Sequence, residues 1–221
     1  MHLHLISFLL LLLAASNYAG PLAGQTVLGL PRPLSLSEVK QELIKAEIIP
    51  SVIDDFEPLY YLDVEWTNSH QSAKLGNHLS PSDVKSKPAK IGLRAEYAVT
   101  DNINHHTSFT VAMTDPDAPS HWDNKWSQFC HWIVSNVSAV HGRSLDKQGP
   151  AELKDIMKYK PPSPPPKTWY HRYVFIAFSS NSTHAPSKPK ERKKWGTGKP
   201  GHGVQDWAKD NGLVPVGKNP R

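Results

Sequence analysis

The amino-acid sequence predicts a mainly β domain with a few short peripheral helices. Proline accounts for 20 of the 221 residues, nearly twice the usual share of ~5%, and proline interrupts helices. Several segments alternate apolar and polar residues with the two-residue period of a strand. Seven Trp, seven Tyr and six Phe supply the apolar area that a core needs. The sequence therefore favours a loop-rich β fold over a helix bundle or a disordered chain.

The spacing of apolar residues places the individual elements. Ser35, followed three residues later by Glu38, forms a capping box that begins an amphipathic helix. Dense apolar runs, typical of central strands, follow in the middle of the chain. Gly212 is a stop signal for the last helix. The predicted helices are 36–48, 150–158 and 204–211, and the predicted strands are 62–66, 91–99, 107–113, 129–137 and 173–178.

Residues 1–19 are expected to be a secretory signal peptide. An apolar stretch without a charged residue ends at Ala15 and is shorter than the about 20 residues that span a bilayer. Small residues follow, as they do at a signal-peptidase site. Because no Lys or Arg precedes the stretch, a strand or helix of the fold is the alternative. Residues 20–34 are then a linker and 35–221 the folded domain, secreted and without a transmembrane segment.

Charge and cysteine content argue against several classes of function. The net charge of +5 equals the charge of the segment 188–199, with six Lys or Arg and one Glu. Such a local run is typical of a solvated loop, and no nucleic-acid partner is expected. The single cysteine, Cys130, excludes an internal disulfide and is expected to be buried and unreactive. No His-Glu-x-x-His or Gly-x-Ser-x-Gly pattern occurs, so no metal, no cofactor and no serine-hydrolase site is expected.

Three segments place polar side chains beside apolar strands. The first, 114–120, interleaves Asp115 and Asp117 with prolines, which predicts a stiff turn that presents two carboxylates. The second places His131 inside an apolar run. The third is the proline-rich stretch 159–173.

These segments resemble the signatures of the phosphatidylethanolamine-binding protein family. Asp-Pro-Asp-Ala-Pro-Ser at 115–120 is similar to the first signature, and the proline-rich stretch running into His-Arg-Tyr at 171–173 is similar to the second. The similarity extends from about residue 60 to 217, and the segment 201–208 is similar to fungal members. The resemblance implies a β-sandwich with a small pocket for phosphate or carboxylate groups. By motif position, the pocket residues would be Asp115, Asp117, His131, Pro166, His171 and Tyr173.

The residue types suit an anion site. Two histidines and a tyrosine can donate hydrogen bonds to an anion, and a protonated histidine adds charge. The two carboxylates are expected to orient the imidazoles and to raise the pKa of both histidines. Arg172 follows His171 on a predicted strand, so it should point to the opposite face and have a structural role.

We expect foremost a secreted binding protein whose partner is a small anionic ligand or a phospholipid head group. One alternative, implied by the resemblance, is an accessory protein or catalyst in fungal secondary metabolism, of the maleidride type in which anhydride monomers are coupled. If the site is catalytic, His131 and His171 would move the proton, and a pathway enzyme would be the partner. Another alternative is a carboxypeptidase-type protease inhibitor. In a secreted chain, Asn136 and Asn181 are candidate glycosylation sites.

Overall fold

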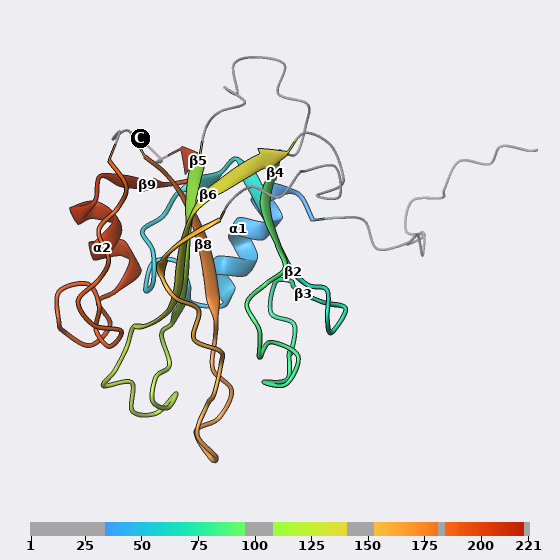
Figure 1. Ribbon diagram of the computed structural model, residues 1–221. Coiled ribbons are helices and arrows are strands. Elements are labelled where there is room, and N and C mark those ends of the chain that lie inside the picture. Colours follow the sequence, from blue (N-terminus) through green and yellow to red (C-terminus); the bar gives the residue numbers. More distant parts are fainter. Residues whose placement is uncertain (1–33, 96–107, 141–152, 181–183, 219–221) are drawn as a thin grey trace, which may run out of the picture. The chain divides into compact units, whose positions relative to one another are not determined.

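The computed structural model describes residues 34–95, 108–140, 153–180 and 184–218, all within a unit that begins at Leu34 (Figure 1). The predicted signal peptide, most of the linker and Asn181 lie outside these residues. No helix in the described part of the chain is long and apolar enough to cross a bilayer. The elements, in order, are α1 (Leu36–Lys45), β1 (Glu57–Pro58), β2 (Tyr60–Trp66), β3 (Gln71–Ala73), β4 (Lys90–Ala95), β5 (Ser108–Asp115), β6 (Phe129–Val140), β7 (Lys154–Met157), β8 (Val174–Ser180), α2 (Val204–Asp210), β9 (Leu213–Pro215) and β10 (Gly217–Lys218).

Most strands join one sheet in the order β3-β2-β4-β6-β5-β8-β9, with β7 also paired to β6. In the described residues, β4 and β6 form a short parallel pairing near Leu93 and Ala139. Beyond this junction the β2–β4 layer packs face to face on β5, β6 and β8, and the Trp66 and Phe175 rings meet at 6.1 Å between the layers. The predicted mainly β fold with short helices is confirmed, and its two layers form a sandwich.

The central strands are buried on both faces. On β5, Val111 and Met113 pack toward the β2–β4 layer, whereas Ala112 packs toward a second core. Helix α2 and the segment 48–56 supply that second core, with Trp207 against Phe178 at 6.3 Å. This double coverage is the physical reason for the dense apolar runs in the sequence.

Helix α1 begins as predicted and ends early. The Ser35 hydroxyl accepts the Glu38 N–H, and the Glu38 carboxylate accepts the Ser35 N–H, which completes the capping box. The helix stops at Lys45 rather than at residue 48. Ile48 and Ile49 turn into the core, each about 5% exposed, and the residue before a proline disfavours helical geometry.

The predicted helix at 150–158 is wrong where the structure describes it, because residues 154–157 form strand β7. Met157 pairs with Ile133 of β6, and Asp155 accepts a hydrogen bond from the Trp132 indole at 2.8 Å. A free edge of β6 thus overrides a weak local helix preference. The predicted strand 91–99 is confirmed as far as Ala95, where the described segment ends.

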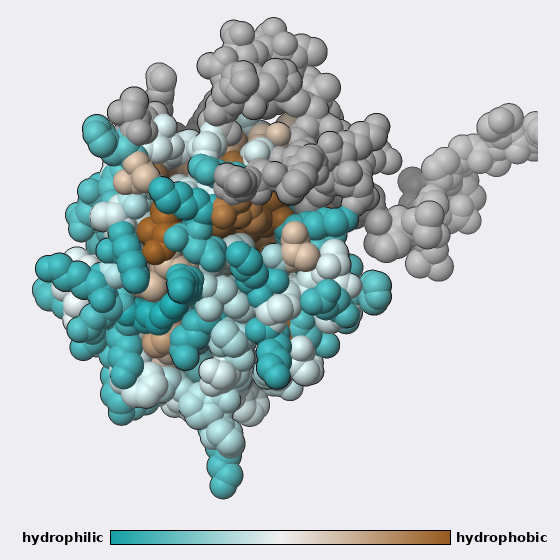
Figure 2. All heavy atoms as spheres, viewed as in Figure 1, coloured by the Kyte–Doolittle hydropathy of each residue, from teal (hydrophilic) through white to brown (hydrophobic). Residues whose placement is uncertain are grey.

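The segment before α2 contacts the start of β6. The buried Gln128 side chain accepts the Val204 N–H at the start of α2 and donates to the Gly201 carbonyl. Gly203 fits this contact because a Cβ there would lie 2.6 Å from the Gln128 Cβ. Most lysines of 188–199 are exposed, as predicted. Figure 2 shows mainly hydrophilic side chains at the left, where Figure 1 places α2.

Candidate functional site

Two loops bring the predicted site residues to one end of the sheet. β5 ends at Asp115, while β6 and β8 begin at the same end, because both are antiparallel to β5. Figure 1 shows the β5–β6 connection in green and the β7–β8 connection in orange, extending together from this end. Side chains far apart in the sequence therefore meet beneath these two loops.

Asp115 and His171 form a buried pair. The His171 Nδ1 lies 2.8 Å from the Asp115 Oδ2, and the two side chains are 2% and 3% exposed. The other imidazole nitrogen contacts the Thr168 hydroxyl at 3.1 Å. Burial lowers the pKa of His171, but hydrogen bonding and attraction to Asp115 outweigh it, so the pKa rises above its ordinary value. The contact with Asp115 therefore favours the protonated form of His171.

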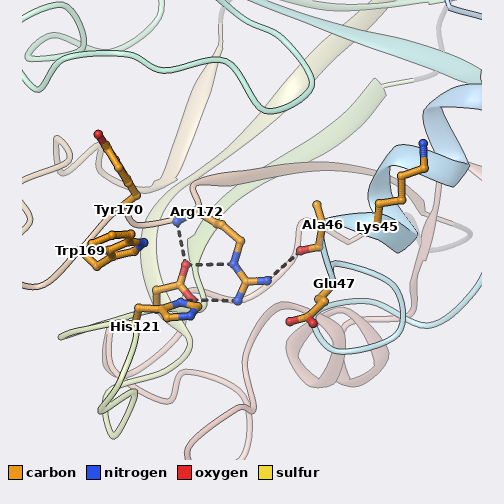
Figure 3. Close-up of a pocket in the computed structure, with 8 residues that line it drawn as sticks. Lys45, Ala46, Glu47, His121, Trp169, Tyr170 and Arg172 are labelled. Carbon is orange, nitrogen blue, oxygen red and sulfur yellow. Dashed lines mark hydrogen bonds and ion pairs between the residues drawn. The ribbon is translucent and has the colours of Figure 1, made fainter.

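Asp117 forms an ion pair with Arg172 (Figure 3), and the His121 Nδ1 lies 3.4 Å from the Asp117 Oδ1. The guanidinium donates from Nε and Nη2 to the two carboxylate oxygens at 3.0 and 2.8 Å, and the Arg172 N–H adds a third bond at 2.8 Å. Burial raises the pKa of Asp117, but these three bonds, the charge of Arg172 and the contact with His121 outweigh it and lower the pKa below its usual range. The Arg172 Nη1 also donates to the Ala46 carbonyl. Arg172 points away from His171 and has the structural role that alternation predicts.

A hollow of about 290 Å³ lies beside this ion pair, between the end of α1 and the two loops. Figure 3 shows Trp169, Tyr170 and His121 on one side of it and Lys45 and Glu47 on the other. Of the six predicted pocket residues, this hollow includes only Asp117.

His131 occupies a β-bulge in β6. Met113 pairs with Trp132 and Thr114 pairs with Cys130, which leaves His131 as the extra residue. Its Nδ1 donates to the Lys160 carbonyl at 2.7 Å, because a carbonyl oxygen can only accept. Burial lowers the pKa of His131, so the expectation of a raised pKa is wrong here. The neutral imidazole presents Nε2 without a hydrogen-bond partner among the described residues.

Tyr173 lies between the two histidines. Its ring meets the His131 ring edge-on at 5.1 Å and is stacked on the His171 ring at 6.2 Å. Burial and the nearby carboxylates hold the pKa of Tyr173 well above its ordinary value, so the phenol keeps its proton. Its hydroxyl has no hydrogen-bond partner in the described part of the chain. Every described side-chain N or O that is shielded from solvent does have a hydrogen-bond partner. Both free groups, the Tyr173 hydroxyl and the His131 Nε2, therefore reach solvent.

Other predicted residues lie apart from this cluster. Pro166 is exposed in a turn of the β7–β8 loop. Asn136 is exposed at a second bulge of β6, with φ of 63°. Cys130 is buried, as expected, and burial raises its pKa to about 12, which disfavours the nucleophilic thiolate. His202 pairs with Asp206 at 2.8 Å in a separate hollow of about 250 Å³.

Arg192 supports the bulge, and sequence reasoning missed it. Its guanidinium donates to the carbonyls of Cys130 at 2.9 Å, His131 at 3.2 Å and Lys158 at 2.8 Å. Its charge also lowers the pKa of His131. The only sequence signal for this role was that an arginine stands within a run of lysines. Unlike lysine, arginine offers a planar fork of donors that can reach several carbonyls.

Comparison with known proteins places the chain in one family. The family model described as phosphatidylethanolamine-binding protein matches residues 69–217. The carboxypeptidase Y inhibitor of Saccharomyces cerevisiae is 32% identical over 79% of this chain and 90% of its own length. CEN-like protein 1 of Nicotiana tabacum is 29% identical over 70% of this chain and 80% of its own.

Solved structures agree with this placement. The crystal structure of carboxypeptidase Y inhibitor complexed with the cognate proteinase has a TM-score of 0.69 at 31% identity, covering 82% of this chain and 92% of that chain. A phosphatidylethanolamine-binding protein from Plasmodium vivax has a TM-score of 0.60 at 21% identity, covering 80% and 93%, and supports the fold alone. This chain belongs to the phosphatidylethanolamine-binding protein family.

Proposed function

We propose that the chain binds a small anion, such as a phosphate or carboxylate group, at His131 and Tyr173. The observation that carries the proposal is that some polar groups of the candidate site already have hydrogen-bond or ion-pair partners, whereas two do not. Asp115 is paired with His171, and Asp117 with Arg172. Among the described groups of the candidate site, the Tyr173 hydroxyl and the His131 Nε2 have no partner, and their rings meet edge-on. A ligand oxygen between them would accept from the phenol.

The tautomer of His131 makes binding depend on protons. Its Nδ1–H is committed to the Lys160 carbonyl, so Nε2 can donate to an anion only after the ring gains a proton. Because burial lowers the pKa of His131, the free protein holds the ring neutral near pH 7. Anion binding should therefore take up a proton and strengthen as the pH falls.

Calorimetric titration with phosphoethanolamine and with acetate, at pH 6 and pH 7.5, tests the proposal. Wild type should bind more tightly at pH 6, and the measured heat should vary with the ionisation enthalpy of the buffer because a proton is taken up. His131→Ala should abolish binding, and Tyr173→Phe, which removes only the hydroxyl, should weaken it. His202→Ala, in the separate hollow, is the matched control. Binding that persists in His131→Ala would overturn the proposal.

A second candidate is inhibition of a serine carboxypeptidase. Identity of 32% to the yeast carboxypeptidase Y inhibitor, and a fold match to that inhibitor in its complex with the proteinase, favour it. Inhibition of carboxypeptidase Y by wild type and by His131→Ala would separate the two functions. Equal inhibition by both proteins assigns the activity to another surface, and no inhibition by wild type removes this candidate.

Secretion and a role in coupling acidic metabolites stay predictions. The metabolic role would use the same histidines, and it predicts that a producing strain carrying His171→Ala loses its product.

Secretion predicts that the mature protein accumulates in the medium with a new N-terminus near residue 20.

A further inference from the structure

We propose that three exposed aromatic side chains form a docking surface for a phospholipid bilayer. Trp122, Trp169 and Tyr170, here called the aromatic rim, are 77%, 66% and 68% exposed. Among the described residues, the other exposed large hydrophobic side chains do not pass 43%. Exposed apolar side chains that gather in one place mark surfaces for a protein or membrane partner.

The rim residues come from two loops that are joined to each other. The His121 N–H donates to the Thr168 carbonyl at 3.3 Å, which links the β5–β6 loop to the β7–β8 loop. The Trp122 ring contacts the His121 ring at 5.0 Å, and the Trp169 and Tyr170 rings meet at 5.9 Å. Figure 3 shows Trp169 and Tyr170 beside His121. The three rings thus belong to one end of the molecule.

The rim also borders the candidate anion site. Tyr170 directly precedes His171, whose ring stacks on Tyr173. Both loops extend from the end of the sheet where β5 ends and β8 begins (Figure 1). A bilayer that meets the rim would hold its head groups at the same end as His131 and Tyr173. In this respect the inference rests on the proposed function.

The local backbone does not favour a tryptophan at this position. Trp169 has φ of 67°, and Lys167 has φ of 68°, in the left-handed region that suits glycine. The Trp169 side chain gains little burial in return. Neither core packing nor backbone geometry therefore explains the ring, whereas contact with an external apolar phase would.

The chemistry of the surroundings favours a bilayer over a protein partner. Trp and Tyr combine an apolar body with a polar tip and gather where membranes meet water. The two loops that carry the rim, 116–128 and 158–170, contain four lysines, all exposed, and two aspartates, of which Asp117 is already paired with Arg172. Figure 2 shows pale side chains of intermediate hydropathy at this lower end, with a hydrophilic tip. Such a surface complements anionic lipids.

Sedimentation with vesicles of equal parts phosphatidylethanolamine and phosphatidylserine tests the inference. The triple variant Trp122→Ala, Trp169→Ala, Tyr170→Ala should lose at least about tenfold in vesicle partitioning, since the apolar contact drives it. Leu59→Ala, which truncates a hydrophobic side chain that is 41% exposed and lies outside both loops, should leave partitioning unchanged. Circular-dichroism melting confirms that each variant is folded.

Two arms separate this inference from the proposed function. The triple variant should still bind soluble phosphoethanolamine, and His131→Ala should still sediment with vesicles. Wild type that stays in solution, or a triple variant that sediments as wild type does, would overturn the docking surface whatever the outcome of the phosphoethanolamine titration. Loss of carboxypeptidase inhibition by the triple variant, with unchanged vesicle binding, would also overturn it and assign the rim to a protein partner.

Discussion

Replacing Arg172 with methionine should destabilise the fold by about 2–3 kcal/mol at pH 7. The change removes two hydrogen bonds to Asp117 and one to the Ala46 carbonyl. The Asp117 side chain is 4% exposed and would keep its charge with only the backbone N–H of residue 172 and His121 close by. Breaking a fully buried pair costs about 3–5 kcal/mol. Because Arg172 is 33% exposed, solvent screens the pair, and the expected cost falls to about 2–3 kcal/mol.

The cost should depend on pH with a definite sign. In wild type the pKa of Asp117 is lowered, so the pair stabilises the fold above the ordinary carboxyl pKa of about 3.9 and is lost as the pH falls further. Without the guanidinium, burial dominates and raises the pKa of Asp117. The folded variant then gains a proton as the pH falls, and its penalty shrinks. The difference from wild type should be larger at pH 7 than at pH 4.5.

Urea unfolding of both proteins at the two pH values measures this difference. The control repeats the substitution in an Asp117→Asn background, where residue 117 carries no charge and Arg172→Met should cost less than about 1 kcal/mol. An equal cost at both pH values and in both backgrounds would refute the electrostatic explanation. It would assign the effect of Arg172 to packing alone.

Three further outcomes are expected. Gly203→Ala should cost about 2 kcal/mol or more in urea unfolding because its Cβ would meet Gln128, while Gly76→Ala, with φ of 75° and open space, should cost about 1 kcal/mol; equal costs would contradict the steric argument. The raised pKa of His171 means that its pair stabilises the fold below about pH 6.5 and loses this effect as the pH rises through the folded value. His171→Gln should therefore destabilise more at pH 5.5 than at pH 8.5, and the reverse order in urea titrations would show the sign to be wrong. Arg192→Met should raise the pKa of His131, as followed by NMR of its ring protons, because a neighbouring positive charge is removed; an unchanged titration would argue against that electrostatic influence.

The local signals in the sequence were the reliable ones. The capping box at Ser35 predicted the start of α1 because both of its hydrogen bonds lie within four residues. The dense apolar runs predicted β6 and β8 as central strands, whereas the two-residue period at 107–113 predicted a strand without showing that both faces of β5 are buried. The helix predicted at 150–158 failed because what decides its structure is the edge of β6, which is distant in sequence until the sheet forms.

The site was predictable in composition and less so in geometry. Motifs placed Asp115 and His171 in one site, and they do form a pair. Burial lowers the pKa of His131, and its place at a bulge is a mismatch between two strands that neither strand's sequence reveals alone. The support that Arg192 gives comes from more than 60 residues away in the chain.

The hydrogen bond from Arg172 to the Ala46 carbonyl spans 126 residues, and β1 pairs with β10 through Glu57 and Lys218. Contacts of such long range slow folding, since loop closure precedes any gain from the contact. During synthesis, β5 and β6 leave the ribosome well before Arg192 does. The bulge that carries His131 can therefore gain its hydrogen bonds from Arg192 only after Arg192 has emerged, so the candidate site is completed late in folding.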